Sequence, residues 1–332
     1  MAAGMDFVQL FQSFSQQKIG VIGDVMLDTY WWGKVDRISP EAPVPIVAVN
    51  KKEQRIGGAG NVALNLRSLG ASVQMISITG NDPEGIQLSE LLKEKEIGTD
   101  YLIAVEGRPT TNKIRIIGRN QQMMRLDAEV TQNIQPDDES KLLTAFAQYL
   151  VNEKPSLVIL EDYNKGVLTA TVIQEVIRLC QAQGVLTAVD PKRKNFFAYQ
   201  GVDIFKPNLQ EAREALNRLP EPVNIETMSA IHADLQQQLH HRISLITLSE
   251  KGVFYKKDAE ATIIPTHVRS IADVSGAGDT VIAVASLVYA TTQNVRLMAE
   301  LANLAGGLVC EEVGTVAIQK DRLLKEAQVV FG

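Results

Sequence analysis

The chain has 332 residues and a mass of 36.4 kDa, which suits one large α/β domain or two smaller domains. Hydrophobic residues make up 45% and charged residues 22% of the sequence, a balance that excludes disorder, collagen and a coiled coil as the main state. Lys and Arg total 33 against 39 Asp and Glu, a net charge of −6, so no basic surplus is available to neutralise a nucleic-acid backbone.

The sequence also lacks targeting and membrane signals. Residues 1–17 have no basic region followed by a continuous apolar core, and no apolar run approaches the roughly 18 residues of a membrane span. Cys180 and Cys310 lie in apolar stretches without the spacing of a zinc or redox site. We therefore expect a cytoplasmic protein that binds neither a membrane nor nucleic acid.

The first apolar run, residues 18–23, predicts a buried strand whose end presents Asp24 and Asp28. Ligands of an open parallel sheet bind at this end of its strands. The two aspartates are candidate acid/base groups, metal ligands or acceptors for sugar hydroxyls. Their spacing does not choose among these roles.

Two segments differ from the rest in composition and in residue pattern, and they predict a small accessory sheet. Residues 30–55 contain Pro40, Pro43 and Pro45 among alternating apolar residues, as in edge strands. Residues 108–126 predict two strands around a turn near Gly118 to Asn120. Together the two segments are expected to form one lid.

Elsewhere, strand and helix patterns alternate, which predicts a mostly parallel central sheet covered by helices on both faces, a three-layer α/β/α domain. Further strands are predicted at 73–78, 157–160, 186–190, 203–206 and 245–248. Helices are predicted at 60–69, 84–96, 137–152, 169–183, 209–215, 225–239, 277–289 and 295–311. With the lid strands inserted in it, the pattern indicates a single domain over residues 1–332.

The sharpest local signal is the string at 273–280 (DVSGAGDT), which an apolar helical run follows. Gly276, Ala277 and Gly278 would present N–H groups at a helix N-terminus, where the helix dipole and the missing side chains favour a phosphate. Asp279, in the first turn, is placed to accept a proton from an attacking hydroxyl. The alternative is a simple turn with an N-capping aspartate.

Residues 57–63 (GGAGNVA) allow several interpretations. The pattern Gly58-x-Gly60-x-x-Ala63 matches a loosened dinucleotide fingerprint and would indicate a dehydrogenase, but a charged run precedes it instead of a buried strand. Alternatively, Gly58 lets the backbone approach a small polyol, and Asn61 hydrogen-bonds its hydroxyls. A helix-opening turn without a ligand also fits.

Several polar residues follow predicted strand ends. Asn208 and Glu211 open a helix after a short strand, where they would hold hydrated magnesium near phosphates, although Asn208 also suits an ordinary N-cap. Lys165 and Lys192 lie on the expected ligand edge, where a phosphorylated substrate needs cations; solvated lysines are the alternative. The histidines are expected on helical or loop surfaces, with no catalytic role: His232, His240, His241 and His267.

The order and spacing of these motifs, with the turn at 248–252 (LSEKG), resemble the ribokinase-like carbohydrate kinases over nearly the whole chain. Longer strings, among them VDRISPEAPVPIV, EDYNKGVL and VDPK, resemble the kinase module of the bifunctional ADP-heptose biosynthesis enzymes. The resemblance implies a ribokinase-like fold and phosphorylation of D-glycero-β-D-manno-heptose 7-phosphate at O1 with ATP and Mg²⁺, on the route to lipopolysaccharide. A kinase of another sugar or sugar phosphate, and a non-catalytic sugar- or nucleotide-binding regulator, stay open as alternatives.

The same resemblance implies roles for individual residues. Asp279 would be the base, and Gly276, Ala277 and Gly278 the anion hole. The sugar would contact Asp28, Gly58 and Asn61, and the magnesium and phosphates Asn208 and Glu211. The nucleotide would lie near Ser249, Glu250, Gly252 and Asn303, and a monovalent cation such as K⁺ near Asp273 and Ser275, with the Gly314 region. Candidates for the sugar 7-phosphate, argued from charge and from the family-like strings, are Lys113, Arg115, Lys165 and Lys192.

The bifunctional enzymes continue into a nucleotidyltransferase module with an HxGH signature, whereas this chain stops at Gly332 without such a string. We therefore expect a stand-alone kinase or one excised module, without a nucleotidyltransferase domain. Because lids of this superfamily often pair across a two-fold axis, the resemblance also implies a homodimer through the lid.

Overall fold

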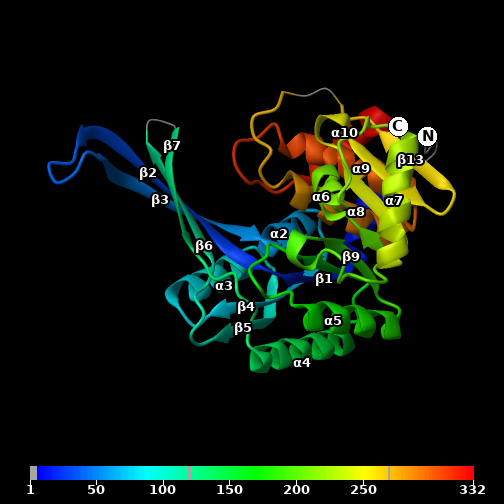
Figure 1. The fold of residues 1–332 in the computed structure, drawn as a ribbon, viewed down its shortest axis with the longest axis horizontal. Helices are drawn as coiled ribbons and strands as arrows, with labels where there is room; N and C mark the ends of the chain where they lie inside the picture. The colour runs from blue at the N-terminus through cyan, green and yellow to red at the C-terminus, as the bar shows by residue number, and fades with distance from the viewer. Residues whose placement is uncertain (1–5, 119–120, 268–269) are drawn as a thin grey trace.

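A computed structural model describes residues 6–118, 121–267 and 270–332, and it contains two sheets (Figure 1). Over these residues the larger sheet has nine strands in the order β13-β12-β11-β10-β9-β8-β1-β4-β5, and the smaller has four in the order β3-β2-β6-β7. The strands of the larger sheet are β1 (Lys18–Gly23), β4 (Ser72–Gly80), β5 (Gly98–Val105), β8 (Leu157–Glu161), β9 (Leu186–Asp190), β10 (Ile204–Phe205), β11 (Ile243–Thr247), β12 (Val253–Lys257) and β13 (Glu260–Ile264). Those of the smaller are β2 (Val25–Ile38), β3 (Pro45–Gly58), β6 (Asn112–Gly118) and β7 (Gln121–Ala128).

The helices lie in two layers, one on each face of the larger sheet. Their bounds are α1 (Phe7–Ser13), α2 (Ala59–Ser68), α3 (Pro83–Glu94), α4 (Pro136–Glu153), α5 (Ala170–Gln183), α6 (Leu209–Ala215), α7 (Ile225–Leu239), α8 (Ala277–Thr292), α9 (Val295–Val309) and α10 (Lys320–Phe331). Helices α4, α5 and α7 share one apolar core, and α1, α2, α8, α9 and α10 share the other. The three-layer α/β/α fold is therefore confirmed.

The central strands are parallel and buried on both faces, as their apolar runs predict. Strand β1 pairs in parallel with β4 and β8, and only the hairpin partner β12 runs against its described neighbours β11 and β13. Alternate residues face opposite layers: Ile159 joins one core and Leu160 the other. Because side chains alternate along a strand, each short strand supplies both cores.

The smaller sheet is the predicted lid, and it projects from the body of the molecule (Figure 1). Its strands are longer than expected, because β1 passes through Asp24 directly into β2 and β3 returns directly into α2. Asp28 therefore lies within β2, which corrects its placement at the end of the first strand. The predicted turn after Gly118 falls on residues 119–120, outside the described residues.

Several elements escaped the sequence patterns. Helix α1 packs against α10, where the rings of Phe7 and Phe331 lie 6.2 Å apart, and β5, β12 and β13 complete the edges of the larger sheet. Short amphipathic segments such as these are stabilised by the surface they cover rather than by their own propensity. No helix in the described parts of the chain is both long and apolar enough to cross a membrane.

The prediction of surface histidines is wrong for His232 and His241, which are 2% and 1% exposed. Both rings contact the hydroxyl of Ser244, at 2.8 Å from His232 and 2.6 Å from His241. Burial lowers the pKa of His232 to about 4 and that of His241 to about 3. Helix α7 and strand β11 enclose these rings, a contact that the local sequence does not reveal.

This pair makes stability depend on pH. Since both folded pKa values lie below the ordinary value of 6.5, the unfolded chain binds more protons as pH falls below about 6.5, and each ring then costs up to about 1.4 kcal/mol per pH unit. Urea unfolding between pH 7.5 and 5 should give a shallower loss of stability for a His232→Gln/His241→Gln variant than for the unaltered protein. The matched control, His240→Asn at an exposed helix end, should keep the original slope; equal slopes for the double variant and the unaltered protein would contradict the assignment.

Candidate active site

Asp279 lies in the first turn of α8, is 5% exposed and uses both carboxylate oxygens. One oxygen accepts a 2.7 Å hydrogen bond from the Asn61 amide, and the other accepts a 2.6 Å bond from the Tyr163 hydroxyl. Burial raises the pKa of Asp279 to about 6, although these two bonds lower it. The carboxylate is therefore held in a fixed orientation with a pKa that suits proton transfer.

The residues before Asp279 form the predicted turn into a helix N-terminus. Gly276 has φ +78°, a left-handed conformation that glycine adopts readily, and a Cβ there would lie 3.0 Å from the Asn61 amide nitrogen. The N–H of Ala277 donates to Val274 at 3.3 Å. No such bond engages the N–H of Gly278 in the described structure, so this amide remains available to an anion.

Three buried carboxylates meet beside this turn. Oxygens of Glu161, at the end of β8, Asp190, at the end of β9, and Asp279 all lie within 4.8 Å of one another. Lys206, itself 2% exposed, pairs with Asp190 at 2.8 Å. A Cβ on Gly278 would lie 3.7 Å from both the Asp190 carboxylate and the Lys206 ammonium, which places this charged group directly against the helix N-terminus.

Sequence reasoning missed Glu161, Asp190, Lys206 and Tyr163. A usable signal was present, because each residue ends a strand of a parallel sheet or lies within two residues of its end, where ligands bind. Their separate strings, EDYNKG, VDPK and FKPN, stand far apart in the chain. Only the strand order β10-β9-β8-β1 brings these ends together.

Asp24 organises the backbone around the site. Its carboxylate accepts hydrogen bonds from the N–H groups of Tyr163, Lys165 and Val167, at 2.8 to 3.0 Å. Burial raises the pKa of Asp24, and these backbone donors lower it. Asp24 thus has a positioning role rather than one toward a ligand.

On the lid side, Asp28 pairs with Arg115 from the neighbouring strand β6. A Cβ on Gly57 would lie 2.3 Å from the Asp28 carboxylate, and Gly58 has φ +58° at the start of α2. The two glycines therefore let this turn approach the aspartate closely. Strand β3, which precedes the turn, belongs to the lid and not to the buried sheet, so the strand context of a dinucleotide fingerprint is absent here.

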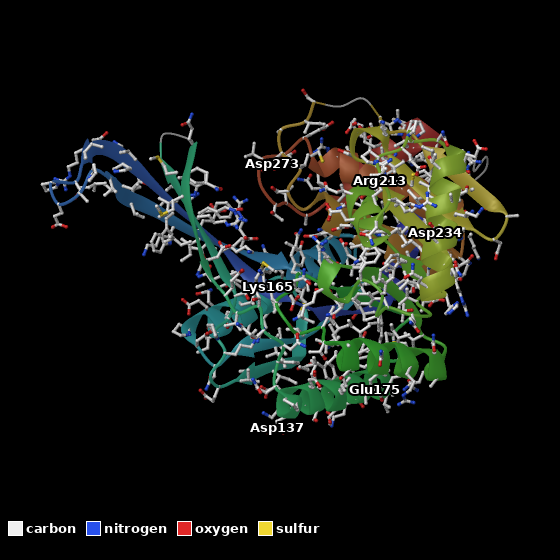
Figure 2. The ribbon with its side chains drawn as sticks, viewed as in Figure 1. Asp137, Lys165, Glu175, Arg213, Asp234 and Asp273 are labelled. Carbon is white, nitrogen blue, oxygen red and sulfur yellow. The ribbon has the colours of Figure 1, made fainter. Side chains whose placement is uncertain are left out.

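The four predicted sugar-phosphate cations fall into two groups. Lys113 and Lys165 both pair with Glu129, at 3.1 and 2.7 Å, and Figure 2 places Lys165 where the lid meets the body. Arg115 also lies on the lid side of the site, where it pairs with Asp28. Lys192 instead pairs with Glu211 at 3.1 Å and Asp190 at 3.4 Å, which puts it with the carboxylate cluster.

Asn208 and Glu211 form a complete capping box at the start of α6. The Asn208 side chain accepts from the Glu211 N–H, and the Glu211 carboxylate accepts from the Asn208 N–H, both at 2.8 Å. The second Glu211 oxygen accepts a hydrogen bond from the Lys192 ammonium. The side-chain oxygens of Asn208 and Glu211 therefore all have partners. The arrangement suits a cation held through its water molecules rather than by direct ligation.

A cavity of about 1290 Å³ gathers the residues predicted to contact the nucleotide. They include Ser249, Glu250 and Gly252 from the turn after β11, and Asn303 from α9, whose amide donates to the Pro265 carbonyl at 2.9 Å. Gly278 and Asn208 also line the cavity. Its size suits a nucleotide, and its wall includes the free N–H of the helix N-terminus.

Asp273 and Ser275, which are predicted to bind a monovalent cation, lie in the loop before α8, and Asp273 connects this loop to Gly314. One Asp273 oxygen accepts from the N–H and hydroxyl of Ser275, and the other accepts from the Gly314 N–H at 3.0 Å. Burial opposes these bonds, yet together they lower the pKa of Asp273. Figure 2 shows Asp273 on the part of the body that faces the lid.

Comparison with known proteins places the chain in a family. The family model described as pfkB family carbohydrate kinase matches residues 16–322. "Bifunctional protein HldE" of Sulfurimonas denitrificans is 38% identical over 314 residues, which cover 94% of this chain and 64% of the relative. The protein of the same name from a Nitratiruptor species is 43% identical over 297 residues, 90% of this chain and 62% of the relative. The chain thus spans less than two thirds of the length of these relatives.

Solved structures share the fold. Arabidopsis thaliana ribokinase complexed with ribose and ATP superposes with a TM-score of 0.72 at 18% identity, over 93% of this chain and 99% of that one. Phosphofructokinase-2 from Escherichia coli in complex with potassium gives a TM-score of 0.75 at 17% identity, over 93% and 97%. With the family model and the curated relatives, these likenesses confirm the predicted ribokinase-like phosphotransferase: the chain belongs to the pfkB family of carbohydrate kinases.

Proposed function

We propose that the protein transfers the γ-phosphate of ATP to O1 of D-glycero-β-D-manno-heptose 7-phosphate and forms the 1,7-bisphosphate, a precursor of ADP-heptose and of the lipopolysaccharide core. The supporting observation is the position of Asp279. The preceding residue, Gly278, lines the cavity, and the Asp279 carboxylate is bonded by Tyr163 and by Asn61, which lies on the helix that follows lid strand β3. The long strings shared with ADP-heptose biosynthesis enzymes support the choice of sugar. A ribokinase-like kinase of another sugar phosphate is the second candidate.

In this mechanism Asp279 takes the proton of the attacking hydroxyl. Asn61 orients the carboxylate through its amide nitrogen, while its buried carbonyl oxygen has no partner among the described residues and is free to accept from a sugar hydroxyl. The Gly278 amide and the Lys206 ammonium, which lies 3.7 Å from the Cβ position of Gly278, would stabilise the charge that builds on the transferred group. Mg²⁺, held through water by Asn208 and Glu211, would neutralise phosphate charge when ATP is bound.

The lid side would receive the sugar and its 7-phosphate. Asp28, Gly58 and Asn61 would contact the sugar hydroxyls, and Lys113, Arg115 and Lys165 the phosphate. Glu129 already holds Lys113 and Lys165 close together. When a phosphate binds, the two lysines would exchange the Glu129 carboxylate for the phosphate. Lys192, paired with Asp190 and Glu211, would contact a phosphate group from the nucleotide side.

Two further parts of the proposal concern assembly and setting. Every residue of the lid edge strand β7 is exposed, including Met124 at 56% and Leu126 at 42%, which supports a homodimer formed through the lid. Asp273 and Ser275 would hold a monovalent cation such as K⁺ behind the anion hole.

The free cysteines Cys180 and Cys310 and the need for ATP support a reducing, cytoplasmic setting.

The direct test is ADP release with ATP and magnesium, comparing D-glycero-D-manno-heptose 7-phosphate with fructose 6-phosphate, ribose and no sugar. Asp279→Asn should retain less than about a hundredth of the activity with the preferred sugar, because a general base contributes at least about 100-fold, while ATP affinity stays within a few-fold. The matched control is Asp203→Asn. This buried carboxylate accepts a hydrogen bond from the Thr187 N–H at the amino ends of β9 and β10, away from Asp279. More than about a tenth of the activity in Asp279→Asn would remove the base role, and turnover with fructose 6-phosphate or ribose alone would discard the heptose.

The sugar-phosphate contacts are tested by Lys165→Ala and Lys113→Ala. Each should raise the KM for the sugar phosphate by at least about tenfold and leave the KM for ATP nearly unchanged, because each removes a charge-assisted hydrogen bond. Glu129→Gln should leave the sugar KM equal or lower, since it removes the anion that competes for both lysines. Lys141→Ala, on the exposed face of α4, serves as the control; a sugar KM that is indifferent to Lys113 and Lys165 would contradict the assignment.

A further inference from the structure

Glu161 is the most unusual polar residue of the described structure. Its side chain is fully buried at the end of β8, and both of its carboxylate oxygens lack a hydrogen-bond partner among the described residues. A buried carboxyl group without a partner costs several kcal/mol unless a proton or a cation compensates it. The proposed phosphoryl transfer assigns no role to this residue.

More carboxylates than cations surround Glu161. Oxygens of Asp190 and Asp279 lie within 4.8 Å of a Glu161 oxygen, and Glu211 adds a fourth carboxylate through Lys192. Lys192 and Lys206 are the cations that face the group. With every carboxylate ionised, four negative charges meet two positive ones, and one divalent cation would balance the cluster.

The geometry also suits a small, hard cation. Two oxygens on opposite sides of an ion lie about 4.2 Å apart for Mg²⁺ and about 4.8 Å apart for Ca²⁺, twice the metal–oxygen distance. Oxygens of the three carboxylates lie within 4.8 Å of one another, so a modest approach of the side chains would also suit Mg²⁺. The donor set is oxygen only, which favours Mg²⁺, Mn²⁺ or Ca²⁺ over zinc or copper. Each carboxylate has two oxygens, so Asp279 can give one to a cation and keep the other for a sugar hydroxyl.

We propose that Glu161, Asp190 and Asp279 bind one divalent cation, at a site separate from the capping box of Asn208 and Glu211. The ion would lie against Gly278, where the anion hole begins. Without it, three carboxylates would repel a phosphate approaching the helix N-terminus; with it, the same cluster attracts one. Only this last consequence rests on the proposed function, because the cation binding itself needs no nucleotide.

The test is Mn²⁺ binding to the nucleotide-free protein, measured by calorimetry and by electron paramagnetic resonance. The unaltered protein should bind one Mn²⁺ that Mg²⁺ displaces, and Glu161→Gln should weaken this binding at least about tenfold. Asp203→Asn, which lies away from the cluster, should bind Mn²⁺ within about threefold of the unaltered protein. Glu211 reaches the cluster only through Lys192, so Glu211→Gln should weaken Mn²⁺ binding less than Glu161→Gln does. Unchanged binding in Glu161→Gln, or a larger loss in Glu211→Gln than in Glu161→Gln, would overturn the proposal.

Thermal unfolding separates a cation from a proton on Glu161. In EDTA, Glu161→Gln should melt no lower than the unaltered protein, because the carboxyl group that it replaces makes no hydrogen bond in the described structure. Added Mg²⁺ should raise the melting temperature of the unaltered protein and leave that of Glu161→Gln unchanged. If Glu161 simply carries a proton, Mg²⁺ will stabilise neither protein, and the proposal fails.

A measurement on the unaltered protein covers the case in which Glu161→Gln does not fold. Terbium(III) bound at this cluster would lie near the phenol of Tyr163, which bonds Asp279, so tyrosine excitation should sensitise terbium emission that Mg²⁺ then quenches. No sensitised emission would count against the site. Since these measurements omit ATP and sugar, their failure leaves the proposed kinase reaction standing, and failure of the kinase assay leaves the cation site standing.

Discussion

The site depends on the hydrogen bonds of one buried residue, Asp24. Its N–H donates to the Glu161 carbonyl and its own carbonyl accepts from the Ala59 N–H, while its carboxylate accepts three N–H groups of the loop after β8. Hydrogen bonds to a charged group contribute about 1.5–3 kcal/mol each, enough to keep a carboxylate in the interior. Helix α2 brings Asn61 and the loop brings Tyr163, and these two side chains orient Asp279. A Cβ on Gly58 would lie 2.4 Å from the Asp24 carbonyl oxygen, so a glycine is required where α2 begins.

The charges around the site are compensated locally. Lys113 and Lys165 share Glu129 on the lid side, and Lys192 and Lys206 share Asp190 on the cavity side. Buried ions without partners would destabilise the fold, so each of these lysines is held in an ion pair. If a phosphate binds as proposed, each lysine exchanges its carboxylate partner for a phosphate oxygen, which costs less than desolvating a free ammonium group. Glu161 is the exception, since neither of its carboxylate oxygens has a hydrogen-bond partner among the described residues.

Periodicity predicted the three layers well because the forces behind it are local. Short apolar runs bounded by glycine and charge indicate buried parallel strands, and the helices at 209–215 and 225–239 have the predicted bounds. Prediction failed where a segment is stabilised by a distant partner. Helix α1 is held by α10, and His232 and His241 are enclosed by the contact of α7 with β11. Neither case leaves a local pattern, because the covering surface comes from elsewhere in the chain.

The sequence by itself determined the family, the lid and the turn before α8, since 273–280 combines glycines, a helix start and an aspartate within eight residues. Contiguous motifs of this kind set their own geometry through backbone conformation. Tertiary structure alone decided which carboxylates surround Asp279, because Glu161 and Asp190 come from two different strands and meet only through the order of the sheet. It also separated Lys192 from Lys113 and Lys165, residues that charge and the family-like strings had grouped together. Electrostatic partners are chosen by distance in space, and a parallel sheet makes neighbours of strand ends that the chain keeps far apart.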